Sequence, residues 1–354
     1  MSAHPDEAFL AVLVQRGHLS MDHAQAIVPS LRGGGSLDDL LEDVAGWDSE
    51  KVHRLRITRG GEEPQIKGYK ILGKLGAGGT AEVFKARDLE RGKTVALKIL
   101  SAPLAREHKS LAAFVREAKM LKQMEHDSIC GGHGVKRAGE TIFAVLDHVE
   151  GQTLQEILDA ADAPLPEEQA LEVILQVAEA LEYMNSMGLV HRDVKPGNIM
   201  LTPRGRAKLI DLGFCAPVGE VGPSDTAAGT KAFLAPEQAL GGGVADLRSD
   251  IYSLGATLFQ LTVGRLPFGD GEDDDVLRKH VMEQLSSPEL KGKSLSTHLQ
   301  YFIEKMMAKD ADVRYQTWVE LIADMSGQLE GKRSADFHAS AKPSKRRRAP
   351  KRPT

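Results

Sequence analysis

Two short segments near the middle of the chain place groups with complementary chemistry close together. The first is His191-Arg192-Asp193-Val194-Lys195-Pro196-Gly197-Asn198, and the second is Asp211-Leu212-Gly213. They supply a candidate base, a lysine that can neutralise phosphate charge, and two candidate magnesium ligands. A transferring phosphoryl group passes through a loose transition state, so a catalyst mostly positions the reactants and neutralises spread negative charge. These residues therefore indicate phosphoryl transfer.

A glycine-rich segment upstream offers a place for phosphate groups. It joins expected strands at residues 69–75 and 83–89, and its residues are Leu75, Gly76, Ala77, Gly78, Gly79, Thr80, Ala81, Glu82 and Val83. Residues without a bulky Cβ let backbone N–H groups approach phosphate oxygens closely. By itself the segment fits an ordinary hairpin turn better than a phosphate site. Because strands flank it on both sides, it differs from P-loops and dinucleotide-binding loops, in which a helix follows the glycines.

A lysine interrupts the next expected strand, at residues 94–100. Lys98 is either an edge-strand side chain that faces water, the usual place for lysine, or a partly buried ammonium that contacts phosphate. Apolar residues recur at helical spacing over residues 110–124, and Glu117 lies beside that apolar stripe. Alone, Glu117 would be a solvated helix residue. Together, the two residues are candidates for an ion pair.

In this order the motifs closely resemble those of the eukaryotic-like serine/threonine protein kinases of bacteria. The resemblance covers about residues 68 to 328. It implies an α+β fold with two lobes, in which an antiparallel β N-lobe carries one helix and the C-lobe is mainly helical. The matching segments are residues 75–83, Val95-Ala96-Leu97-Lys98, Glu117, residues 191–198, Asp211-Leu212-Gly213 and Ala235-Pro236-Glu237.

The resemblance assigns nucleotide-binding roles to the first part of the domain. The loop at residues 75–83 would cover the phosphates of ATP. Lys98 would contact the α- and β-phosphates and pair with Glu117. Leu146 would lie at the back of the adenine pocket, and residues 147–149 would form the hinge that offers backbone groups to the base.

The resemblance assigns the chemical step to the second part. Asp193 would accept the proton of the substrate hydroxyl, and Lys195 would neutralise charge near the transferring phosphoryl group. Asn198 and Asp211 would hold Mg²⁺, which prefers hard oxygen ligands. His191 would be structural and pack under the catalytic loop.

Two positions depart from the family pattern. Ala81 stands where the commonest loop has a third glycine, and Leu212 stands where phenylalanine is usual. Ala81 is small and Leu212 keeps an apolar side chain, so neither change removes a charged group. An inactive pseudokinase would usually lack Lys98, Asp193 or Asp211. All three are present, which favours an active kinase.

The substrate class follows from two features of the resemblance. Lys195 stands two residues after Asp193, as in serine/threonine kinases. Gly229-Thr230 and Ala235-Pro236-Glu237 belong to a segment that shapes a peptide-docking surface in protein kinases. Related small-molecule kinases, the rival enzyme class, generally lack this segment. A protein substrate is therefore favoured, and Thr230 would bond to Asp193 and Lys195.

The polar segment between residues 214 and 234 suggests a switch. We hypothesise that Ser224 or Thr226 is autophosphorylated and that the added charge, close to two units, pairs with Arg192. The alternative is a loop whose hydroxyl groups serve only solubility.

The second half of the expected domain also carries helical patterns. Residues 167–187 have one apolar face, whereas residues 249–266 are apolar nearly all round, which is typical of a buried helix. Asp250 is either a plain N-terminal helix acid or, as the resemblance implies, an acceptor for catalytic-loop backbone. The resemblance also implies a buried ion pair between Arg314 and Glu237.

Positive charge is concentrated at the end of the chain. Residues 342–354 hold seven Lys or Arg and no acid, which leaves 38 basic and 50 acidic residues before them, a net charge of −12. Because residues 342–354 have no apolar content to bury, we expect residues 332–354 to be a disordered basic tail. An anionic partner (nucleic acid or a lipid surface), the acidic body of the chain, and no partner at all are the open alternatives.

The first 63 residues carry a different pattern. Short apolar groups separated by Gly17 and Gly33-Gly34-Gly35 predict short helices. Residues 16–20 and 36–41 resemble the N-terminal helical module of type II secretion ATPases. We expect residues 1–63 to form a small helical interaction or regulatory module with a protein partner, and an inert helical cap is the alternative.

These patterns divide the chain into that module, a catalytic domain and the basic tail. The catalytic domain spans residues 69–328, with an N-lobe at about 69–147 and a C-lobe at about 150–328. The predicted function is signalling by ATP- and Mg²⁺-dependent phosphorylation of serine or threonine in proteins. The alternative is a kinase-fold scaffold that binds nucleotide and acts through the module or the tail.

The hydropathy of the chain predicts where the protein is located in the cell. No apolar run reaches the roughly 18 residues that a transmembrane helix needs. Residues 1–9 are acidic rather than basic, which is unlike a signal peptide. We therefore predict a cytoplasmic protein with no transmembrane segment.

Overall fold

The structure is a computed structural model that divides into two compact units. One comprises residues 1–125 and 130–148, and the other comprises residues 126–129 and 149–354. Ser224, Thr226, Thr230 and the basic tail lie outside the described residues. The residues described are 5–57, 64–161, 163–220, 231–240, 245–269, 271–283, 285 and 295–331.

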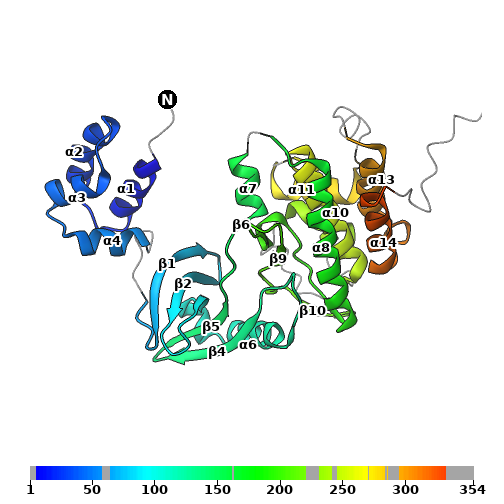
Figure 1. The fold of residues 1–354 in the computed structure, drawn as a ribbon, viewed down its shortest axis with the longest axis horizontal. Helices are drawn as coiled ribbons and strands as arrows, with labels where there is room; N and C mark the ends of the chain where they lie inside the picture. Colours follow the sequence, from blue (N-terminus) through cyan, green and yellow to red (C-terminus); the bar gives the residue numbers. More distant parts are fainter. Residues whose placement is uncertain are drawn as a thin grey trace, which may run out of the picture. The chain divides into compact units, whose positions relative to one another are not determined.

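The first unit begins with four short helices, drawn in blue in Figure 1. They are α1 (Pro5–Gln15), α2 (Met21–Arg32), α3 (Leu37–Ala45) and α4 (Ser49–Ile57). The Ser20 side chain caps α2 by accepting the His23 N–H at 3.2 Å, and Gly46 ends α3 with a φ of 65°. The helices share one apolar core, formed by Leu10, Leu13, Leu19, Ala24, Ile27, Leu31, Leu37, Leu41, Trp47, Val52 and Leu55.

A five-stranded antiparallel sheet follows, with the order β1-β2-β3-β5-β4. Its central strand is therefore β3. The strands are β1 (Tyr69–Ala77), β2 (Ala81–Asp88), β3 (Thr94–Leu100), β4 (Gly132–Ala138) and β5 (Thr141–Asp147). Besides the expected helix, α6 (His108–Gln123), this part contains the five-residue helix α5 (Ala102–Arg106).

The core of this sheet extends beyond the predicted start of the catalytic domain. Ile66 precedes β1 but is 5% exposed and packs into the cluster that covers one face of the sheet. The other buried members are Ile71, Phe84, Ala86, Val95, Leu97, Ile99, Phe143 and Val145. The strands also run further than predicted, to Ala77 and from Ala81, so the glycine-rich segment is a tight hairpin closed by the Gly78 N–H to Ala81 carbonyl bond.

The second unit is mainly helical and contains two small sheets. The order of one sheet is β6-β8-β9, and in the other β7 pairs with β10. The strands are β6 (Gln152–Thr153), β7 (Leu189–Val190), β8 (Ile199–Leu201), β9 (Ala207–Leu209) and β10 (Ala216–Pro217). The α-helices are α7 (Leu154–Ala160), α8 (Glu167–Ser186), α9 (Pro236–Ala239), α10 (Leu247–Val263), α11 (Asp273–Met282), α13 (Thr297–Met306) and α14 (Trp318–Leu329), and the 3₁₀-helices are η1 (Pro196–Asn198), η2 (Lys231–Phe233) and η3 (Ala311–Val313).

Helix α10 forms the centre of this unit and packs against α8 and α13. It is apolar on most faces and is buried along nearly its whole length, as the sequence predicts. Its bounds differ from the predicted 249–266 for local reasons. The Asp246 side chain caps the start by accepting the Arg248 N–H at 2.8 Å, and Gly264 ends the helix with a φ of 79°.

An antiparallel sheet with its helices in one unit and a mainly helical second unit constitute the predicted two-lobed α+β fold. Among the described residues, no helix has the length and the apolar content needed to cross a membrane.

Candidate active site

Lys98 lies on the central strand and forms the predicted ion pair with Glu117 of α6. Its Nζ donates to Glu117 Oε1 at 2.7 Å, and the two side chains are 13% and 10% exposed. The alternative of an edge-strand lysine facing water is therefore wrong. A charge-assisted hydrogen bond in this sheltered position holds the ammonium in one place.

Strand register decides which predicted residues share a sheet face with Lys98. Val83 on β2 and Ala144 on β5 lie directly opposite Lys98, so their side chains project to the same side. Leu146, two residues beyond Ala144, also projects there. The apolar cluster around Leu97 covers the opposite face, which leaves the Lys98 face as the one that carries the candidate nucleotide residues.

Glu82 projects to the other side of the sheet. It pairs with Ile99, a member of the apolar cluster, and its carboxylate forms an ion pair with Lys74 on β1. The Lys74 side chain is only 6% exposed, and its Nζ lies 5.8 Å from the Phe84 ring centroid. Any contact between Glu82 and a phosphate would therefore involve its backbone N–H.

The remaining loop residues occupy the hairpin itself. Leu75, Gly76 and Ala77 end β1, Gly78 to Thr80 form the turn, and Ala81 begins β2. A Cβ added to Gly76 or Gly79 would meet no atom within 4 Å, so the space beside these backbones is open.

In the second unit, the catalytic-loop residues are in contact with one another. Lys195 Nζ lies 2.8 Å from Asp193 Oδ2, and Asn198 Nδ2 donates to the same oxygen at 2.8 Å. Asn198 Nδ2 also donates to the Asp193 backbone carbonyl at 2.8 Å. The Asp193 carboxylate, 11% exposed, is therefore held between a cation and an amide donor.

Asp250 fixes the backbone just before Asp193. Its two carboxylate oxygens accept the His191 and Arg192 N–H groups, each at 2.7 Å, which confirms the predicted contact. Arg192 is the only described non-glycine residue with a positive φ, 70°, a conformation that costs about 1–3 kcal/mol and needs such support. Burial raises the pKa of Asp250 to about 7. Burial lowers the pKa of His191, and its Nδ1 accepts the Asp193 N–H at 3.3 Å.

The β8–β9 hairpin brings Asn198 and Asp211 to the same end. Ile199 pairs with Leu209, and the Ile210 N–H donates to the Asn198 carbonyl at 3.0 Å. Asp211 Oδ1 accepts the Gly213 N–H at 3.0 Å. Because the Asn198 amide nitrogen faces Asp193, its oxygen is turned away and can serve as a ligand. An amide oxygen and a carboxylate fit a hard divalent cation.

Comparison with known proteins decides the family. The protein kinase domain matches residues 69–324, which is most of the chain. The chain belongs to the protein kinase family. It is 38% identical over 283 residues to a probable serine/threonine-protein kinase of Streptomyces coelicolor. It is 36% identical over 264 residues to the serine/threonine-protein kinase PknB of Mycobacterium leprae, and 37% identical over 265 residues to that of Mycobacterium tuberculosis.

These matches cover 76%, 73% and 73% of this chain but only 41%, 42% and 42% of the three relatives. The chain therefore spans about two fifths of the length of the relatives it matches. Kinases of this family use ATP and a divalent metal.

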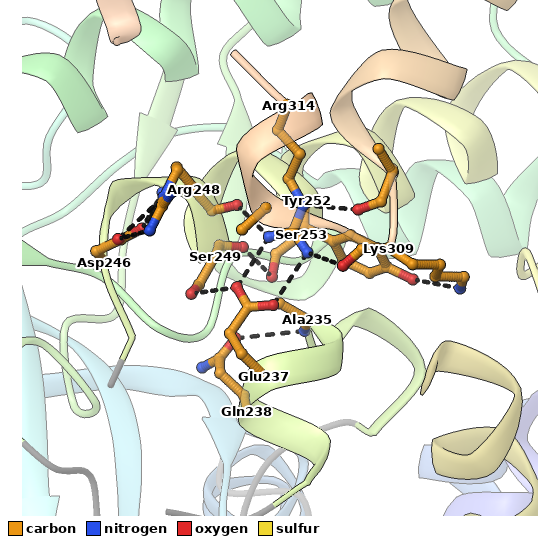
Figure 2. A network of polar contacts seen from close by, with 12 residues as sticks. Ala235, Glu237, Gln238, Asp246, Arg248, Ser249, Tyr252, Ser253, Lys309 and Arg314 are labelled. Atoms are coloured by element: carbon orange, nitrogen blue, oxygen red, sulfur yellow. Dashed lines mark hydrogen bonds and ion pairs between the residues drawn. The ribbon is translucent and has the colours of Figure 1, made fainter. Parts of the chain in front are cut away.

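The kinase domain also contains the predicted ion pair between Glu237 and Arg314 (Figure 2). Arg314 Nη1 and Nη2 donate to Glu237 Oε1 and Oε2 at 2.8 and 3.0 Å, a bidentate contact. Arg314 is 2% exposed. The pair ties the Ala235-Pro236-Glu237 motif to the segment that precedes α14.

Two serines on α10 form hydrogen bonds with this motif and with the segment before it, and the sequence did not predict these contacts. Ser249 Oγ donates to Glu237 Oε1 at 2.7 Å, and Ser253 Oγ donates to the Phe233 carbonyl at 2.8 Å. Thr257 continues the series, one helical turn further along. Small hydroxyl residues repeated every four positions in an otherwise apolar helix are the signal that could have revealed this polar stripe.

We expect Glu117→Gln to lower kcat/KM for ATP by about tenfold or more, because a neutral amide replaces the charge that holds the Lys98 ammonium. Steady-state kinetics with varied ATP would measure the effect. Glu140→Gln makes the same chemical change at a side chain that is 93% exposed and should match the wild type. Equal efficiency of Glu117→Gln and the wild type would refute this role.

Proposed function

We propose that this chain transfers the γ-phosphoryl group of ATP to serine or threonine hydroxyls of proteins. The observation that carries the proposal is the Asp193 carboxylate, held by Lys195 and Asn198 beside the hairpin end that bears Asp211. Proton acceptance, charge neutralisation and metal binding are thereby supplied by neighbouring side chains, which is what phosphoryl transfer requires.

In this proposal each residue of the second unit has one task. Asp193 accepts the proton of the attacking hydroxyl on Oδ1, whose contact with Lys195 Nζ is the longer one, 3.1 Å, while Oδ2 is held by Lys195 and Asn198 at 2.8 Å. Lys195 neutralises charge on the transferring group and stays within 2.8 Å of Asp193. Asn198 and Asp211 hold Mg²⁺, which when bound neutralises phosphate charge.

The first unit supplies most of the nucleotide contacts in this proposal. We assign Lys98 to the α- and β-phosphates, with Glu117 keeping its ammonium in position. The backbone of residues 75–83 covers the phosphates. Leu146 and residues 147–149 contact the adenine, in agreement with the position of Leu146 on the Lys98 face of the sheet.

We also propose that phosphorylation of the loop after Asp211 regulates the activity. Arg192 Nη2 donates to the Glu220 carbonyl, and the buried Arg192 Nε has no hydrogen-bond partner among the described residues. Because this Nε could donate to a phosphate, we propose that a phosphate on Ser224 or Thr226 is the partner of the Arg192 guanidinium. Replacing both residues by alanine should lower activity, and unchanged activity would rule out the switch.

Further proposals concern the regions of the chain and its location. We propose a helical module at residues 1–63 with a protein partner, a catalytic domain at 69–328, and a basic tail at 332–354 with an anionic partner. We also propose that the protein is cytoplasmic. The scaffold alternative is disfavoured by the family match and by the presence of Lys98, Asp193 and Asp211.

The deciding experiment incubates the purified chain with γ-labelled ATP and a generic basic protein, and then identifies the labelled residues. We expect phosphoserine or phosphothreonine when Mg²⁺ is present. Chelation should abolish labelling and added Mg²⁺ should restore it, because the protein offers few ligands of its own and the phosphates complete the metal site. Bound nucleotide without any transfer would support the scaffold instead.

A further inference from the structure

One lysine attaches the segment before the Ala235-Pro236-Glu237 motif to helix α11. Lys231 begins η2, and its Nζ lies 3.0 Å from Asp273 Oδ2 and 3.9 Å from Asp274 Oδ1. The Lys231 side chain is 16% exposed, whereas those of Asp273 and Asp274 are 73% and 100% exposed. A mostly covered ammonium is thus neutralised by the first turn of α11.

The other end of α11 is anchored to the buried helix α10. His280 is fully buried in the last turn, and its Nδ1 lies 2.9 Å from the Tyr252 hydroxyl oxygen on α10. Lys309 Nζ donates to the His280 carbonyl at 2.7 Å and to the Tyr252 hydroxyl at 3.2 Å. It also lies 4.3 Å from the Phe268 ring centroid. A cation on these terminal carbonyls stabilises the helix end, so α11 is a fixed support.

The backbone of η2 is held independently of Lys231. Ala232 and Phe233 are buried, and the Phe233 carbonyl accepts the Ser253 hydroxyl. At the start of η2, Lys231 adds an ion pair with α11. Loss of the ion pair would therefore shift this end of the segment without detaching the motif that follows.

We propose that the Lys231–Asp273 ion pair holds η2 in the conformation that accepts the protein substrate. This rests on the proposed function, in which the segment bears the peptide. Lys231 and Asp273 are positioning residues in this scheme. Without Asp273, a mostly covered cation has to move toward water or another acid. Without Lys231, η2 loses this ion pair with α11.

The test measures KM for myelin basic protein, KM for ATP and kcat in the full chain. Lys231→Met and Asp273→Asn change the net charge in opposite directions. If positioning matters, both raise KM for the protein, by about three- to tenfold, while KM for ATP stays constant. The double variant should be no worse than either single one, because both remove the same contact. The double variant Asp273→Asn/Asp274→Asn should raise KM for the protein more than Asp273→Asn alone does.

Asp275→Asn is the matched control on the same helix. Asp275 bonds to Arg278 and Lys279, each at 2.7 Å, so its loss repeats the charge change without touching Lys231. We expect its KM for the protein to be unchanged. The exchanged pair Lys231→Asp/Asp273→Lys should recover at least part of the loss, and thermal melting would confirm that each variant is folded.

Two results would overturn the positioning role. Opposite changes of KM in Lys231→Met and Asp273→Asn would mean simple charge attraction to the basic substrate, and unchanged KM in both would mean no role. A wild type that phosphorylates no protein would instead refute the proposed function, so the two failures are distinguishable.

Discussion

Asp193→Asn should lower kcat for protein phosphorylation by a factor on the order of 10²–10⁴, the range expected for loss of a general base. The change keeps the size of the side chain but removes the oxygen that receives the proton. It also removes the charge that balances Lys195, whose Nζ lies 2.8 Å away. ATP affinity should change much less, because the proposed nucleotide contacts come mostly from other residues. Single-turnover rates and nucleotide titration would separate the two effects.

Asp127→Asn is the matched control for this substitution. The Asp127 side chain is 87% exposed, and its contact with Arg206 is 3.9 Å long. The same chemical change at this position should leave both kcat and KM at wild-type values. A kcat for Asp193→Asn within tenfold of the wild type would contradict the assignment of Asp193 as base.

Arg314→Met should destabilise the second unit by about 3–5 kcal/mol, the usual result of removing one partner from a buried ion pair. Glu237 would keep the Ser249 hydrogen bond but lose both guanidinium bonds. Chemical unfolding at neutral pH, followed by the fluorescence of the buried Trp318 in a Trp47→Phe background, would report on this unit. The double variant Arg314→Met/Glu237→Met should recover much of the loss, since it leaves no unpaired charge.

The pH dependence of this effect has a definite sign. Burial alone would raise the pKa of Glu237, but the hydrogen bond and charge of Arg314 outweigh it and hold that pKa below its usual range. The stability contributed by the pair is therefore present above the unfolded-state pKa of glutamate and is lost as pH falls through the lower folded-state pKa. Arg314→Met should abolish this acid-side loss.

Arg248→Met is the comparison for that experiment. Arg248 also forms ion pairs, with Asp246 and Asp312, but its side chain is 29% exposed. Exposed pairs contribute about 1 kcal/mol or less. Equal destabilisation by Arg248→Met and Arg314→Met would mean that burial does not determine the strength of the Glu237 contact.

The sequence by itself determined the chemistry of this protein and the types of its elements. Reactive side chains such as Asp193 and Lys195 lie two positions apart, so their proximity follows from the covalent chain. Residues 249–266 are apolar nearly all round, which predicted α10 as a buried helix. The family resemblance supplied the distant partners Lys98–Glu117 and Glu237–Arg314. Helix and strand ends shifted, because capping by Asp246 and closure of the Gly78–Ala81 hairpin depend on local geometry.

The tertiary structure alone decided where other side chains point and what they contact. The direction of Glu82 follows from its pairing with Ile99, and β1 changes register between Lys74 and Gly76, an irregularity that composition does not reveal. The Lys231–Asp273 contact joins segments about forty residues apart, and many charged residues could have filled either place. Such contacts depend on how elements pack, and packing is set by the whole core rather than by the residues in contact.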